Sequence, residues 1–161
     1  MTSKIGSDVI QKKLTHFGFP AIQDKLKFKS KEELAKELSK KPVSDVWFTG
    51  DRIRLTFDEE RISNKVNVVK HEQWVGSFSR KRPVVYIDND VPGKYRRSLT
   101  IHETIEKYLS EKYGLDPNNE AHFAAEEIER REFLKSHSQR EWEEYSNITE
   151  QIHRKELSWL K

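Results

Sequence analysis

The sequence predicts an α+β fold in which a small, mostly antiparallel sheet precedes a helical half. Hydrophobic residues alternate with polar ones between residues 45 and 90, but after Pro92 and Gly93 they recur at helical spacing. Only 34% of the residues are hydrophobic and 35% are charged, which is typical of long solvated helices around a modest core. The length of 161 residues fits a single domain, since such a chain buries roughly 70% of its unfolded surface. Its parts are an N-terminal helical arm (1–40), the sheet (45–90) and a helical subdomain (94–161).

The N-terminal arm reads as two short helices, Ser7 to Phe17 and Ser30 to Leu38, separated at the sequence GFP. Ser30 followed by Glu33 is a capping box, in which each residue satisfies a free backbone N–H of the first turn. The arm is rich in lysine. We interpret it as a solvated amphipathic segment, with contact to an acidic partner as the alternative.

The sheet is expected to begin with a β-hairpin that turns at Gly50 and Asp51. On one side of this turn Ile53, Leu55 and Phe57 alternate with polar residues, as a half-buried strand requires. The segments KVNVV and WVGSF continue the strand pattern. A last strand covers residues 83–88.

The helical half is expected to contain three helices. Ser98 is the candidate N-cap of the first, which ends at Tyr113 before Gly114 as the C′ glycine. Asp116 is the candidate N-cap of the second, with Pro117 at the first helical position. A third helix packs as a C-terminal brace. The expected ranges are 98–113, 117 to about 135, and 139–159.

Composition and charge exclude several classes of protein. No apolar run approaches the roughly 20 residues that cross a bilayer, and the N-terminus lacks the apolar core of a secretion signal. We therefore expect no membrane partner and a cytoplasmic location. The net charge is +3 with both signs interspersed, which favours a solvated surface over a nucleic-acid-binding one.

The absence of cysteine limits the chemistry of any metal site. Disulfides, thiolate zinc sites and cysteine nucleophiles are excluded, so a metal ion must be held by imidazole and carboxylate groups. There is no glycine-rich phosphate loop and no G-x-S-x-G motif.

The sequence HETIE places a histidine and two glutamates on the first predicted helix. His102 and Glu106 are one turn apart and adjoin the stripe of core residues that includes Ile105. Glu103 lies beside them on the side that faces away from the core. The second helix repeats the four-residue spacing with His122 and Glu126.

A short connection makes the two helices antiparallel neighbours. At about 1.5 Å per residue, His122 should then face Glu106, and Glu126 should face His102. Imidazole and carboxylate together suit Zn²⁺ and other divalent ions such as Mn²⁺ or Co²⁺. The sequence therefore predicts a metal site formed by His102, Glu106, His122 and Glu126.

This region resembles the zincin metallopeptidases, whose active helix carries the motif H-E-x-x-H. The shared features are HETIE, the strand VVYID ahead of it, and a second helix that would deliver the third ligand, as in the gluzincin branch. The chain is also similar to small phage and archaeal proteins with an H-E-x-x-E helix followed by AH and an acidic residue. The resemblance covers residues 83–129, about half the chain.

Glu106 stands where the zincin motif has its second histidine. A gluzincin uses two histidines and one glutamate, and His102, Glu106 and His122 supply the same set with two positions exchanged. The resemblance implies that Glu103 is the base that activates a metal-bound water. It implies that Glu126 is a fourth ligand, which would close the site to catalysis, or an acceptor that orients an imidazole.

The resemblance also implies an edge strand near residues 86–88 that holds an extended peptide by main-chain pairing. We thus expect a zinc-dependent hydrolase that acts on peptide or protein substrates. The alternative is a non-catalytic interaction or regulatory domain that keeps the fold. A third reading is a nucleic-acid-binding accessory protein that uses the basic runs RKR and KYRR beside the last strand.

Overall fold

The structure is a computed structural model that describes residues 30–70 and 74–158, with side chains as far as residue 155. The elements in chain order are α3 (Lys31–Ser39), β1 (Val43–Thr49), β2 (Arg52–Phe57), β3 (Glu60–Val69), β4 (Gly76–Phe78), β5 (Val84–Asp88), α4 (Gly93–Tyr113), α5 (Glu120–Phe133) and α6 (Gln139–Ser158). The predicted helix at residues 7–17 lies outside the described residues. None of the helices in the described ranges is long and apolar enough to cross a membrane.

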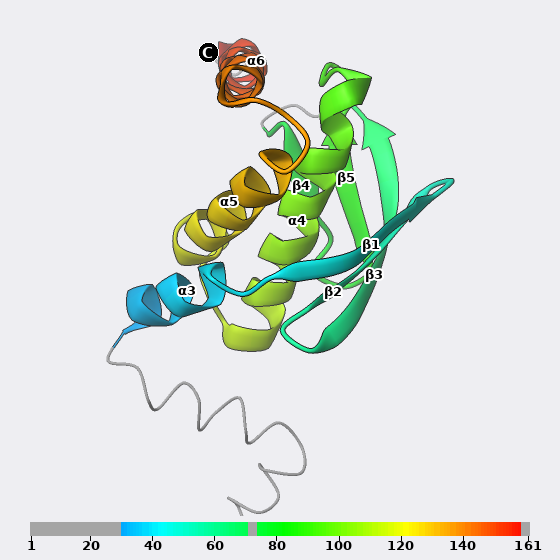
Figure 1. Ribbon diagram of the computed structural model, residues 1–161. Helices are drawn as coiled ribbons and strands as arrows, with labels where there is room; N and C mark the ends of the chain where they lie inside the picture. Colours follow the sequence, from blue (N-terminus) through cyan, green and yellow to red (C-terminus); the bar gives the residue numbers. More distant parts are fainter. Residues whose placement is uncertain (1–29, 71–73, 159–161) are drawn as a thin grey trace, which may run out of the picture.

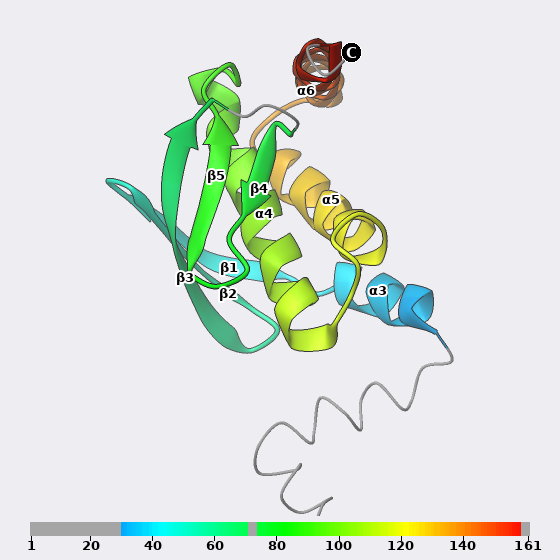
Figure 2. The same ribbon diagram turned by 180° about the vertical axis from the view of Figure 1, so that it is seen from behind.

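The predicted α+β class is confirmed. The five strands form one sheet in the order β1-β2-β3-β5-β4. Only the β3–β5 pair is parallel, and the other pairs are antiparallel. The helices gather on one face of the sheet, and over the described residues no element covers the other face (Figures 1 and 2).

The predicted hairpin is also confirmed, with Gly50 in the turn between β1 and β2 at a φ of +52°. Ile53, Leu55 and Phe57 point into the core with no more than 1% of their surface exposed. They pack with Ile105 of α4. Because successive side chains of a strand point to opposite faces, the residues between them face solvent.

Helix α4 begins earlier than predicted. It starts at Gly93 with Pro92 as N-cap, so Ser98 lies within the helix and is not its cap. Proline is tolerated at the start of a helix because the first N–H groups have no partner there. The end is as predicted, since Gly114 closes α4 in the left-handed conformation at a φ of +67°.

Helix α5 begins later than predicted, at Glu120 instead of Pro117. The Asp116 side chain accepts a hydrogen bond from the Asn118 N–H (2.8 Å), which holds residues 117–119 in a turn. The carbonyl of Asp116 accepts from the Ala121 N–H, and only from there does the chain continue as a helix. The second helix is therefore displaced by three residues from its expected start, and it ends at Phe133.

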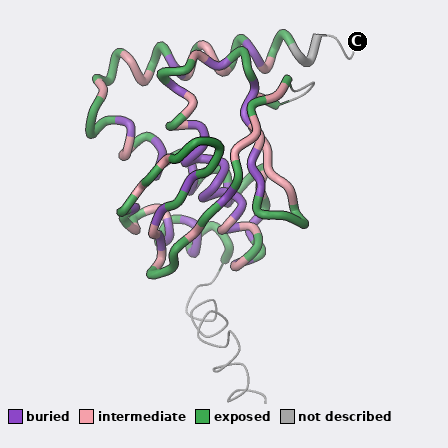
Figure 3. The backbone as a smooth tube through the Cα atoms, turned by 90° about the vertical axis from the view of Figure 1, so that its right-hand side faces the viewer, coloured by how far each residue is buried: buried purple, intermediate pink, exposed green. Residues whose placement is uncertain are grey.

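The outer helices α3 and α6 occur where the sequence places them. Ser30 caps α3, and its side chain accepts from the Glu33 N–H at 3.1 Å. Helix α6 lies across one end of the molecule and is largely exposed, while buried residues concentrate between the helices and the sheet (Figure 3). It packs through Tyr145 and Ile152 against Tyr95 and other residues of a second apolar cluster.

Asp58 joins the β2–β3 turn to the end of α4. Its carboxylate accepts hydrogen bonds from the hydroxyls of Tyr108 (2.9 Å) and Tyr113, and Lys41 lies 3.1 Å away. Burial alone would raise the pKa of Asp58, but the bonds from Tyr113, Lys41 and Tyr108 outweigh it and lower the pKa. The ionised carboxylate therefore stabilises the fold.

We predict that Asp58→Asn lowers the free energy of unfolding by roughly 1–2 kcal/mol at neutral pH, because it removes a charged acceptor. A lowered pKa contributes stability above the unfolded value of about 3.9 and loses it as pH falls through the folded value. The difference from the parent protein should therefore shrink below about pH 4. Urea unfolding at several pH values measures this. Glu59→Gln, at the exposed neighbour in the same turn, is the control, and an equal loss in both variants would contradict the assignment.

Candidate metal centre

Three potential metal ligands meet between α4 and α5. His102 Nε2 lies 2.9 Å from Glu106 Oε2, and His122 Nδ1 lies 3.0 Å from the same oxygen. The two imidazole nitrogens are 3.2 Å apart. The structure thus brings His122 to Glu106, as the sequence predicted. Among the described residues these three form the group whose donor atoms converge on one point.

Small residues on α5 allow this approach. Ala121, Ala124 and Ala125 are fully buried in the core where α5 packs against α4 and α3. Because alanine adds little bulk, the two backbones come close enough for the histidine and glutamate side chains to meet. The four-residue spacing of His102 and Glu106 then places both on the face that looks toward α5.

The partner of His102 on α5 is Glu129, and the expectation that Glu126 faces His102 is wrong. Glu129 Oε1 lies 3.0 Å from His102 Nδ1. Because α5 begins three residues later than expected, the residue level with His102 is also three positions further along the chain. Glu129 is two helical turns after His122 and shares its face, so the spacing signal for it was present in the sequence.

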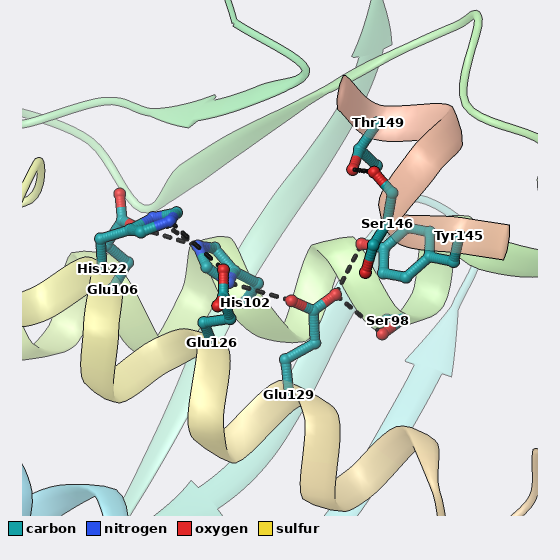
Figure 4. Close-up of polar contacts among 9 residues, drawn as sticks. All are labelled: Ser98, His102, Glu106, His122, Glu126, Glu129, Tyr145, Ser146 and Thr149. Carbon is teal, nitrogen blue, oxygen red and sulfur yellow. Dashed lines mark hydrogen bonds and ion pairs between the residues drawn. The ribbon is translucent and has the colours of Figure 1, made fainter. Parts of the chain in front are cut away.

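Glu129 is held by a buried hydrogen-bond network. Its second oxygen accepts from the hydroxyls of Ser98 (2.8 Å) and Tyr145 (2.5 Å), as Figure 4 shows. Tyr145 belongs to α6, so three helices contribute to one carboxylate. A carboxylate at Nδ1 fixes which imidazole nitrogen carries the proton, and leaves His102 Nε2 directed at Glu106 and His122.

Glu126 lies at the outer side of the cluster. Its carboxylate is 3.6 Å from His122 Nε2, the nitrogen that points away from Glu106. The side chains of His122 and Glu126 are 51% and 55% exposed, whereas those of His102 and Glu106 are buried. Glu126 therefore stands where an acceptor orients an imidazole, and the cluster is open to solvent on the side of His122.

Glu103 is buried under strand β4. A Cβ atom at Gly76 would lie 2.8 Å from Glu103 Oε2, so the missing side chain of Gly76 makes room for this carboxylate. The sequence placed Glu103 on the side away from the core, and β4 covers that side. Its Oε1 is buried without a hydrogen-bond partner in the described structure. Burial, and then the charge of Glu106, raise the pKa of Glu103 to about 8.

The electrostatics of the cluster favour protonated imidazoles. Burial alone would lower the pKa of His102, but contacts with Glu106 and Glu129 raise it well above its usual value. The hydrogen bond to Glu106, and then the carboxylate of Glu126 nearby, raise the pKa of His122 to about 9. Burial opposes ionisation of Glu106, yet the two histidines lower its pKa. An ion bound here would take the place of those protons.

The strand beside the cluster is β4, and the expectation of an edge strand at residues 86–88 is wrong. Strand β5 lies between β3 and β4 and is paired on both sides, so β4 is the edge. The cause is the short segment WVGSF, which pairs outside β5. Lys107 of α4 anchors the end of β4, since its ammonium donates to the carbonyl of Ser79 at 2.6 Å.

A cleft of about 710 Å³ runs from β4 across the cluster to α6. His102, Glu103, Glu106 and His122 line it, and Trp74 and Trp142 supply aromatic surface. Two nitrogen donors and one oxygen donor spaced about 3 Å apart fit a zinc-like ion, whose ligands lie at about 2.0–2.2 Å. The donor set, its convergence and the carboxylate behind His102 therefore fit a divalent metal ion.

We predict that Glu129→Gln costs roughly 2–3 kcal/mol of unfolding free energy, because it removes a buried charged acceptor with three donors. Glu126→Gln, the matched change three residues away on the exposed side, should cost no more than about 0.5 kcal/mol. Chemical denaturation of both variants measures the difference. Similar losses in the two proteins would show that Glu129 has no special structural role.

Comparison with protein-family models, with curated proteins and with solved structures finds no match for this chain.

Proposed function

We propose that this protein is a metal-dependent hydrolase of the zincin type that acts on peptide bonds. The observation that carries the proposal is the convergence of His102 Nε2, Glu106 Oε2 and His122 Nδ1 beside the buried carboxylate of Glu103. The cleft that contains these groups has an edge strand as one wall.

The metal would be held by His102, Glu106 and His122, with Zn²⁺ as the expected ion and Mn²⁺ or Co²⁺ as alternatives. Such an ion polarises a carbonyl group and makes water more acidic. The carboxylate of Glu129 would fix His102, and Glu126 would orient His122. With three protein ligands, one coordination position would stay open, as a catalytic site requires.

Glu103 is the proposed general base. It would take a proton from the attacking water while the water oxygen adds to the scissile carbonyl carbon. It would then give that proton to the departing amine as the C–N bond breaks. An extended peptide would lie along β4, where main-chain groups of residues 76–78 are at the sheet edge. Gly76 places this strand directly against Glu103.

The resemblance to zincins supports this reading. The HETIE sequence lies on α4, a strand precedes it, and the next helix contributes His122. The chain differs from the zincin motif at Glu106, and the geometry accommodates the difference because Glu106 and His122 reach the same point from facing helices.

A specific observation favours a second function, a non-catalytic domain in which the cluster has a structural role. Glu106 already accepts from both imidazoles, so the hydrogen bonds of the cluster are satisfied without an ion. In that case the only role of the cluster would be to hold α4 and α5 together. Metal binding and hydrolysis separate the two functions.

We predict that untagged protein binds one Zn²⁺ per chain and that the ion raises the unfolding free energy by about 3 kcal/mol at a hundredfold excess over Kd. His122→Ala should weaken binding at least a hundredfold because it removes one ligand. His137→Gln, outside the cleft, is the control. Elemental analysis, calorimetry and thermal melts provide the readouts. If no metal is bound and the melting temperature does not change on adding Zn²⁺, the metal site is contradicted and the non-catalytic, structural role of the cluster is favoured.

We predict that Glu103→Gln lowers the hydrolysis of a mixed peptide library by about 10²–10⁴-fold, because the amide cannot accept the proton. Zinc affinity should stay within a few fold of the parent, since Glu103 is not among the proposed ligands. Glu127→Gln, on the exposed side of α5, is the control. Full activity in Glu103→Gln would remove this residue from the mechanism.

A further inference from the structure

The face of the sheet opposite the helices carries a group of cations. On β2, the exposed residues Arg52 and Arg54 alternate with the buried Ile53 and Leu55, so both arginines point away from the helices. No described element covers this face (Figures 1 and 2).

Strand β3 places further cations next to these arginines. Lys65 is the cross-strand partner of Arg52. Arg61 is the partner of Thr56, which is the next residue after Arg54 on the same face of β2. Side chains directly opposite each other are about 5 Å apart, and neighbours along a strand on one face are about 7 Å apart. Like charges in such positions repel each other, and a bound polyanion would remove the repulsion.

Among the described residues, few acids offset these charges. Asp51 lies 3.9 Å from Lys65, with both side chains well exposed, and Asp45 accepts a hydrogen bond from Thr56. Glu60 is directed to the other side, toward Tyr108 and Lys112. The helical side has the opposite balance, and the charged residues of α5 are Glu120, Glu126, Glu127, Glu129, Glu132, Arg130 and Arg131.

Aromatic side chains stand among the cations. Trp47 is the cross-strand partner of Arg54, is 52% exposed, and has the Arg54 guanidinium 4.4 Å from its ring centre. Tyr86 of β5 lies on the same face, because its partner on β3 is Asn67, two residues from Lys65. Arg82 donates to the Tyr86 hydroxyl at 3.4 Å.

We propose that this face binds single-stranded nucleic acid through Trp47, Arg52, Arg54, Arg61, Lys65 and Tyr86. The cations contact successive phosphates, and the aromatic rings stack with bases. Trp47 of β1 and Tyr86 of β5 lie on one sheet face with two strands between them, so each ring can stack with a different unpaired base. The bases of a duplex are already stacked and enclosed. Every base of a single strand has a planar face for stacking, so exposed aromatic rings beside the cations favour nucleic acid over an acidic protein.

The test is fluorescence anisotropy with labelled oligonucleotides of about 16 nucleotides, as single-stranded DNA, single-stranded RNA and duplex DNA. The full chain should bind both single strands, and binding should be unaffected by EDTA because the surface lies apart from the metal centre. The variant Arg54→Gln/Arg61→Gln/Lys65→Gln should bind much more weakly. The slope of log K against log salt should fall in magnitude by about 2, since each phosphate contact contributes about 0.7.

The control variant changes three exposed arginines on the helical side, Arg130→Gln/Arg140→Gln/Arg154→Gln, and has the same net charge. It should bind as the parent does. Trp47→Ala should lose about tenfold in affinity through lost stacking, and Trp74→Ala, which removes a similarly exposed tryptophan (48%), should lose none. Circular dichroism checks that each variant folds.

The proposal would be overturned if no single strand bound at about 50 mM salt up to about 100 µM protein. Equal losses of affinity in the two triple variants would also overturn it. So would stronger binding to duplex than to single strands, or full competition by poly-glutamate at equal charge.

Discussion

The contact between α4 and α5 is the constraint on which the site depends. Alanines on α5 let the helices approach, and the approach brings His102, Glu106 and His122 to a single point. The same contact buries Glu129, and burial makes the hydrogen bonds from Ser98 and Tyr145 necessary, because an unpaired carboxylate there would be costly. Tyr145 of α6 therefore supports a site that is formed by α4 and α5.

Much of the fold could be predicted from the sequence, because it rests on local signals. The alternation of Ile53, Leu55 and Phe57 identifies a half-buried strand, and Gly114 marks the end of α4. The starts of α4 and α5 could not be predicted in the same way. Pro92 before α4 and Pro117 before α5 each permit a helix or a turn. The helix begins directly after Pro92, whereas the hydrogen bond between Asp116 and Asn118 holds a turn at Pro117.

The candidate site was predictable in part for the same reason. The residues of α4 and His122 follow from helical spacing alone. Glu129 was missed because its assignment depends on where α5 begins, and a three-residue difference replaces Glu126 with Glu129. The position of β4 outside β5 was missed as well, since strand order is set by long-range pairing that periodicity does not report.

The distribution of charge shows a different limit of prediction from the sequence. Along the chain, acids and bases alternate and suggest an even surface. In space they separate, because Arg52 and Arg54 of one strand are joined by Arg61 and Lys65 of the next, while the glutamates of α5 lie behind the sheet. Sheet formation therefore separates the charges of a single stretch, residues 52–65, because its cations lie on one face whereas Asp58 and Glu60 point to α4.

Gly76 and Glu103 illustrate how two positions far apart in the chain become one evolutionary unit. A side chain at position 76 would occupy the space of the Glu103 carboxylate, and a shorter acid at position 103 would leave that space empty. Substitution at either position alone is thus unfavourable, so the two residues are expected to change together. In an alignment of relatives the two columns should therefore covary.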